Sequence, residues 1–217
     1  MTAEDPPDDG TRTPTDASTE TQYPVDVLVS PDWVDARLDQ FVTDDPDYRL
    51  LEVDANPAFY DTGHAPGAAR VDWRTDLRSA KSHDILDADE MASFLGAHGI
   101  DGETTVVVYG DNSNWFAAHL YWQLTHYGHS DVRIMDGGRE YWTDYDYPTT
   151  TDPVDPPAVE YDGPLGDPAG TAVRADREDV QDALDTETAF VDVRLPEEFR
   201  GDITKPPGIS EGAMRGG

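Results

Sequence analysis

Short strand-like runs alternate with helix-patterned segments along most of this chain, and this alternation limits the fold more than any other feature. The runs at 50–53, 104–109 and 131–135 have strand character, and helical spacing of apolar residues occupies 31–41, 87–98 and 115–127. Strands separated by helices form largely parallel sheets with helices on both faces. The predicted fold class is therefore α/β, with a mostly parallel central sheet flanked by helices.

Two helix boundaries carry chemical signals. Ser30 followed by Pro31 predicts an N-cap and a first helical residue, because proline has no N–H to leave unpaired there. Gly99 is placed to end the helix of 87–98, which is expected to bury Met91 and Leu95.

The stretch VVVYGDNSNWFAAHLYW (106–122) predicts a strand, a tight loop and a helix from Trp115. In several α/β enzyme families the nucleophile lies on the turn after such a strand, where N–H groups at the helix start bind an oxyanion. The loop here contains no cysteine and consists of Gly110, Asp111, Asn112, Ser113 and Asn114.

The net charge of -31 excludes several classes of partner. An acidic surface repels nucleic acid and anionic membranes. A hydrophobic content of 37% with 10% aromatic residues favours a folded protein over a disordered acidic one. Self-repulsion at this charge is screened in about 1 M salt, where the Debye length is about 3 Å. We therefore expect a halophilic, cytoplasmic protein, and no apolar run approaches the ~18 residues of a membrane-spanning helix.

A repeat with a period of 140 residues divides the chain. Val193 aligns with Val53 and Phe199 with Phe59, and the strand-then-helix pattern of 28–39 returns at 172–185. We predict a disordered acidic tail at 1–22, a first domain at 23–145, a linker at 146–170 and an incomplete second domain at 171–217. A free unit as short as 171–217 lacks the central strands of a core.

Four motifs together resemble the rhodanese-like sulfurtransferase family. DTGHAPGAARVDW (61–73) resembles the family's G-H-x-P-G-A signature, and 106–142 resembles its active-loop strand through the L-x-G-G-x-x-x-W segment. FVDVRLPEEFRGD (190–202) resembles the opening of a second such domain, and GISEGAMRGG (208–217) resembles the lead-in to a second signature. The order is similar to that of tandem thiosulfate and mercaptopyruvate sulfurtransferases, with the chain ending inside the second domain.

This resemblance implies an inactive first domain and a second domain whose loop cysteine carries sulfane sulfur as a persulfide to cyanide or another thiophile. Gly110 and Asp111 stand where the cysteine would be, so no catalytic residue is expected in this chain and the nucleophile is expected beyond residue 217. Arg194 and Arg200 are candidates for binding the small anionic donor or orienting the cysteine loop. The alternative for both is an ion pair with Glu197 or Glu198.

We expect no cofactor and no metal. We do expect the two domains to contact each other. The sequence does not choose between thiosulfate and mercaptopyruvate as donor. The alternative function is a non-catalytic rhodanese-like binding or regulatory module. Reading the coding DNA past Gly217 would separate the two functions.

The spacing of polar residues argues against other roles for Asp111 and its neighbours. An aspartyl nucleophile at Asp111 lacks the second aspartate that such loops carry at the position of Ser113, and a calcium loop has different spacing. The polar loop side chains are therefore expected to hydrogen-bond the backbone. His64 is expected to order its turn, and the other histidines considered are expected to be exposed or interdomain: His119, His126 and His129. A further set of aromatic residues is expected to fill the core and the domain contact: Trp115, Phe116, Tyr121, Trp122, Tyr141 and Trp142.

Overall fold

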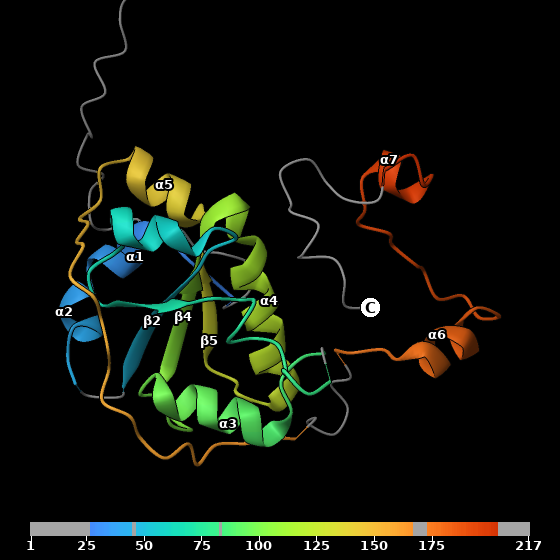
Figure 1. Ribbon diagram of the computed structural model, residues 1–217, viewed down its shortest axis with the longest axis horizontal. Coiled ribbons are helices and arrows are strands. Elements are labelled where there is room, and N and C mark those ends of the chain that lie inside the picture. Colours follow the sequence, from blue (N-terminus) through green and yellow to red (C-terminus); the bar gives the residue numbers. More distant parts are fainter. Residues whose placement is uncertain (1–26, 45–46, 83, 167–172, 204–217) are drawn as a thin grey trace, which may run out of the picture.

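A single parallel sheet forms the centre of the molecule (Figure 1). The computed structural model describes residues 27–44, 47–82, 84–166 and 173–203, so the predictions for 1–22 and 208–217 lie outside the described residues. The strand order is β1-β5-β4-β2-β3, and every pairing is parallel. The strands are β1 (Leu28–Val29), β2 (Tyr48–Val53), β3 (Ala68–Val71), β4 (Thr105–Tyr109) and β5 (Val132–Met135). The predicted α/β class is confirmed.

Helices cover both faces of the sheet. They are α1 (Pro31–Asp35), α2 (Leu38–Phe41), the 3-10 helix η1 (Pro57–Thr62), α3 (Ala88–Ala97), α4 (Asp111–Tyr127) and α5 (Gly138–Asp144). Two further helices, α6 (Arg177–Ala183) and α7 (Pro196–Phe199), lie apart from the sheet (Figure 1). Successive strand residues point to opposite faces. Val106 and Val108 therefore enter the core cluster beneath α3 and α4, while Val107 and Tyr109 enter the cluster beneath α1, α2 and α5.

Both helix boundaries predicted from capping signals are confirmed. The Ser30 side chain accepts a hydrogen bond from the Trp33 N–H at 3.1 Å, and Gly99 follows α3 with a φ of +67°. The helical stretch expected at 31–41 is instead divided into α1 and α2. The Arg37 guanidinium donates to the Trp33 carbonyl, which a continuous helix would pair with the Arg37 N–H, and that N–H donates to Val34 instead.

Residues 147–165, which we call the strap, are extended and pack on the first unit. The strap lies within the predicted linker and runs from α5 past α2 and beneath α3 (Figure 1). His64 and Thr150 exchange two backbone hydrogen bonds of 2.9 Å, and the Val159 N–H donates to the Gly96 carbonyl. Tyr147 and Tyr161 are buried in the two core clusters. The strap therefore contributes to the core of the first unit.

Gly96 provides a test of this packing. A Cβ added at Gly96 would lie 2.5 Å from the Val159 carbonyl oxygen, whereas one at Gly166 meets nothing within 4 Å. We expect Gly96→Ala to lower the free energy of unfolding by about 1–3 kcal/mol through steric displacement of the strap. Gly166→Ala should change it by less than about 0.5 kcal/mol. Denaturant unfolding measures both, and equal stability of the two variants would contradict the packing.

The repeat implies a strand at 190–193, equivalent to the predicted strand at 50–53, and this strand is absent among residues 173–203. Val191 and Val193 are 84% and 93% exposed, whereas their repeat equivalents Leu51 and Val53 are fully buried in β2. β2 is hydrogen-bonded on one side to β3 and on the other to β4, and a strand without such partners is unstable in water. Of the strand and helix expected at 172–185, the helix is present as α6, and no strand forms in the described part.

Candidate functional site

The loop after β4 has an unusual backbone. Asn112, Ser113 and Asn114 have φ values of +50°, +57° and +64°, and regular helical geometry begins after them. The left-handed region costs about 1–2 kcal/mol for residues other than glycine, and asparagine tolerates it best. The Asn114 side chain holds the turn, since its oxygen accepts from the Gly110 N–H at 3.0 Å and its amide donates to the Met135 carbonyl at 2.7 Å.

Gly110 brings this loop against the end of β2. A Cβ at this position would lie 2.1 Å from the Val53 carbonyl oxygen, so no other residue fits without displacing the backbone. The Gly110 carbonyl in turn accepts from the Arg139 N–H at the start of α5.

Asp111 is buried, 3% exposed, and its carboxylate oxygens and its N–H are all hydrogen-bonded. Its carboxylate oxygens accept from the Ala55 N–H at 2.6 Å and the Asn56 N–H at 3.2 Å, and its own N–H donates to the Asp54 carboxylate at 2.8 Å. The expected backbone hydrogen bonds are confirmed for Asp111 and Asn114. Asn112 contributes through its main chain, where its N–H donates to Glu140.

An aspartyl nucleophile needs a carboxylate oxygen that is open to substrate. Both oxygens of Asp111 already accept N–H groups, and the residue is buried. Within the described residues, no group of three histidine, cysteine, aspartate or glutamate side chains could hold a metal ion.

A buried acid pair lies beneath the loop. Glu52, near the end of β2, accepts from the Tyr109 hydroxyl and forms an ion pair with Arg139, and Asp54 lies beside it. Burial, and after it the charge of Asp54, raises the pKa of Glu52 to about 9, and burial also raises the pKa of Asp54. Burial thus favours the protonated form of each carboxyl over that of a free carboxyl, and the proximity of Asp54 adds to this effect at Glu52. This pair was not predicted from the sequence, where the available signal is the glutamate inside the apolar run LLEV (50–53).

Arg139 joins the elements around the loop. Besides Glu52, its guanidinium donates to the carbonyls of Phe59 at 2.9 Å and Gly63 at 2.6 Å, and to the Thr62 hydroxyl at 3.3 Å. β2, η1 and α5 are thus fixed to one another by a single buried cation.

The acid pair predicts a pH dependence of stability. The folded-state pKa of Glu52, about 9, lies above its ordinary value of 4.5, so its contribution is fully present below pH 4.5 and is lost as the pH rises through 9. The free energy of unfolding should fall with pH in this window, by at most about 1.4 kcal/mol per unit for one proton. Glu52→Gln should flatten the slope in denaturant titrations at high salt. If the Glu52→Gln variant had the same slope of unfolding free energy against pH as the unaltered protein, Glu52 would be ionised throughout this pH range.

The histidines differ in their surroundings. His64 is buried and stacked on Tyr60, with its ring nitrogens 3.0 Å from the carbonyl oxygens of Tyr60 and Asp152, which confirms the expected ordering of its turn. The exposure expected for His129 is wrong, because the ring is buried with Nε2 2.9 Å from the Thr104 carbonyl oxygen. His119 and His126 are half-buried.

The aromatic residues also divide. Trp142 is in the core as expected, with its indole N–H donating to the Pro148 carbonyl. Trp115 is 49% exposed and Tyr141 is also exposed, so neither fills the core, and their contact with the second domain stays a prediction. Trp115 directly follows the left-handed turn and rests on Phe116 at the surface.

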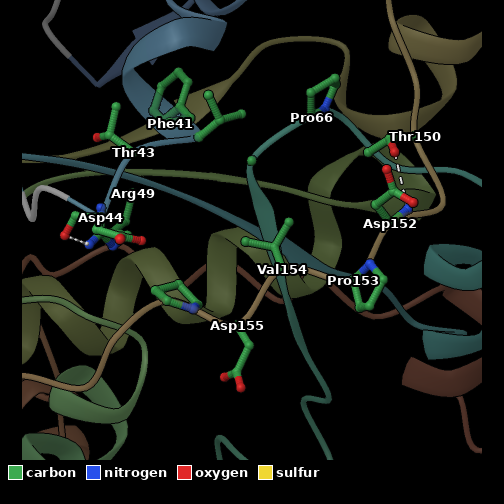
Figure 2. A pocket seen from close by; sticks show the side chains of 13 residues that line it. Phe41, Thr43, Asp44, Arg49, Pro66, Thr150, Asp152, Pro153, Val154 and Asp155 are labelled. Carbon is green, nitrogen blue, oxygen red and sulfur yellow. Dashed lines mark hydrogen bonds between the residues drawn. The ribbon is translucent and has the colours of Figure 1, made fainter.

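A separate pocket of about 370 Å³ lies between α2 and the strap (Figure 2). Phe41, Pro66 and Val154 form apolar walls, and the Arg49 guanidinium donates to the backbone carbonyls of Tyr48 and Asp44. Arg49 is at the amino end of β2, whereas loop 110–114 follows the carboxyl end of parallel β4. This pocket is therefore not part of the loop site.

Comparison with known proteins fits the loop and the fold. Residues 30–145 match the model of the rhodanese-like domain. A putative thiosulfate sulfurtransferase of Haloferax volcanii is 50% identical over 197 residues, with 90% of this chain and 67% of that protein covered. The chain belongs to the rhodanese family.

Other rhodanese relatives agree. The sulfur carrier protein TtuD of Thermus thermophilus is 41% identical, with 88% of this chain and 66% of that protein covered. In fold, the chain resembles the crystal structure of SseA from Escherichia coli, a 3-mercaptopyruvate sulfotransferase, with a TM-score of 0.60 and 21% identity over 73% of this chain and 62% of SseA. The chain spans about two thirds of the length of the curated relatives named here.

The two candidate arginines lie in the exposed segment that follows the rhodanese domain. Arg194 pairs with Asp192, and Arg200 pairs with Asp202 at 2.9 Å and Glu197 at 3.7 Å. Both arginines thus contact acids of their own segment. No helix among the described residues has the length and apolar character needed to cross a membrane.

Proposed function

We propose that this chain supplies the non-catalytic first domain, and the beginning of the second, of a thiosulfate sulfurtransferase. A cysteine thiolate of the second domain attacks the outer sulfur of thiosulfate, forming an S–S bond while sulfite leaves with the electron pair. Cyanide or another thiophile then takes the outer sulfur and releases the thiolate. The observation that carries the proposal is Asp111, which fills the nucleophile position with a carboxylate held by two N–H groups.

The internal repeat supports a role for Arg194. At the offset of 140 residues, Arg194 corresponds to Asp54, which accepts the Asp111 N–H in the first loop. The second loop would then have an arginine where the first has an acid. A guanidinium there attracts an anionic donor and lowers the pKa of a neighbouring thiol.

The offset of 140 residues also predicts a second difference between the surroundings of the two loops. Pro196 corresponds to Asn56, whose N–H holds one oxygen of Asp111, and proline has no N–H to donate. The second loop thus lacks one of the two groups that fix a carboxylate. Arg200 corresponds to Tyr60, and we propose it as a second positive group near the donor.

The relatives' names support the reaction class: one is a putative thiosulfate sulfurtransferase and another a sulfur carrier protein. The net charge of -31 supports a cytoplasmic protein working at high salt.

Thiocyanate formation from thiosulfate and cyanide tests the proposal. Residues 1–217 should form none above background, and a version extended through the second domain should turn over, losing activity when its loop cysteine becomes serine. Turnover by the 217-residue chain, which has no cysteine, would contradict the persulfide argument. An inactive extended version with a folded second domain would instead favour the binding module.

A further inference from the structure

The junction between the first domain and the second unit is fixed at one place on the surface. The Trp122 indole N–H donates to the Val173 carbonyl at 2.8 Å, and the Arg174 guanidinium pairs with the Asp84 carboxylate. After these contacts, α6 and α7 stand apart from the body (Figure 1). Within 175–203, the hydrogen bonds and ion pairs of the described residues stay inside that segment.

Neighbouring side chains of α4 hold the Trp122 ring in place independently of its contact with Val173. His119 and His126 stack on either side along α4, with ring centroids 5.7 and 6.1 Å from that of Trp122. His119 is itself held 3.0 Å from the Gln123 amide nitrogen, which donates to the Leu77 carbonyl. A ring fixed in this way loses little side-chain entropy when its N–H binds a carbonyl.

The Asp84 contact adds a charge-assisted component. Its hydrogen bond from Arg174 holds the pKa of Asp84 below its usual range. Both side chains are partly exposed, so salt screens this pair, whereas the indole hydrogen bond is less sensitive to salt.

We propose that the face of α4 around Trp122, together with Asp84, is a docking surface for the first residues of the second unit, with Val173 and Arg174 as its anchor. This inference rests on the proposed two-domain organisation. The carboxyl half of α4 then holds the second unit, while the amino end of the same helix carries the loop of Asp111.

Tryptic cleavage after Arg174 tests the anchor, because the protease must release this residue from Asp84. We expect the 217-residue chain to be cut there more slowly than a peptide of residues 170–180. Trp122→Phe keeps an aromatic ring but removes the indole N–H donor, and Asp84→Asn removes the carboxylate charge. Each should raise the rate at Arg174, by about fivefold for loss of one net hydrogen bond, while cleavage after Arg194 stays unchanged.

Trp115→Phe is the matched control, since it makes the same substitution on the same helix at an exposed site. It should leave cleavage at Arg174 unchanged. Cleavage of the unaltered chain as fast as the peptide, or rates unaffected by Trp122→Phe and Asp84→Asn, would overturn the proposal.

A distance measurement provides a second readout that does not depend on sulfur transfer. The chain has no cysteine, so spin labels can be placed cleanly at Ser93→Cys on α3 and Gln181→Cys on α6. We expect a single narrow distance distribution that broadens at least twofold in the Trp122→Phe, Asp84→Asn double variant. Equal widths in the two proteins would overturn the anchor even if the longer protein transfers sulfur.

Discussion

Replacing Asp111 with alanine should destabilise the first domain by about 1–3 kcal/mol, because it removes the acceptor of two partly buried N–H groups. These donors belong to Ala55 and Asn56 at the start of η1. Part of the loss is offset, since the Asp111 charge raises the pKa of Asp54 and its removal relieves that repulsion. Urea unfolding followed by tryptophan fluorescence measures the net effect.

Ser113→Ala is the matched control for Asp111→Ala. Ser113 is in the same left-handed turn and its side chain is exposed, so its loss should change stability by less than about 0.5 kcal/mol. Asp111→Asn should fall between the two, because an amide keeps one acceptor. A neutral Asp111→Ala would mean that the loop is not held by this carboxylate.

Replacing Arg139 with methionine should cost about 3–5 kcal/mol, which is the range for removing one partner of a buried ion pair. The change would leave Glu52 without its cation and would remove the guanidinium donor from the Gly63 and Phe59 carbonyls, although Phe59 keeps its hydrogen bond from the Thr62 hydroxyl. Arg139→Lys should recover only part of this, because an ammonium group cannot reproduce the planar fork of the guanidinium. Thermal and urea unfolding measure the series.

Arg133→Met is the control, because Arg133 pairs with Asp131 in a partly exposed position where such pairs contribute about 0–1 kcal/mol. A double variant separates the causes. If the Glu52–Arg139 contact carries the effect, Glu52→Gln combined with Arg139→Met should lose less stability than the sum of the two single losses. Strictly additive losses would contradict the ion-pair explanation.

Much of the fold was predictable because its signals are local. The alternation of strands and helices, the Ser30 cap and the Gly99 stop each depend on a few neighbouring residues, and each is present in the structure. The strand that the repeat implies at 190–193 shows the limit of local signals, because Val191 and Val193 have strand character but no neighbouring strand to pair with in the described chain.

The loop could be located from sequence, but its interactions could not. Asp111 was recognised by its position, while its partners Ala55 and Asn56 are more than 50 positions away in the chain. The same holds for Glu52 and Arg139, which only the packing of β2 against α5 brings together. The raised pKa of Glu52 depends on burial, which charge composition alone does not reveal.

The strap has a practical consequence for dissecting this protein. The family match ends at residue 145, and a polypeptide cut there would lack Tyr147 and Tyr161, which fill the two cores from outside the matched region. Without these two side chains, apolar surface would be exposed on both sides of the sheet, and such exposure favours aggregation. The smallest piece expected to fold independently therefore extends to about residue 165, twenty residues beyond the limit set by family resemblance.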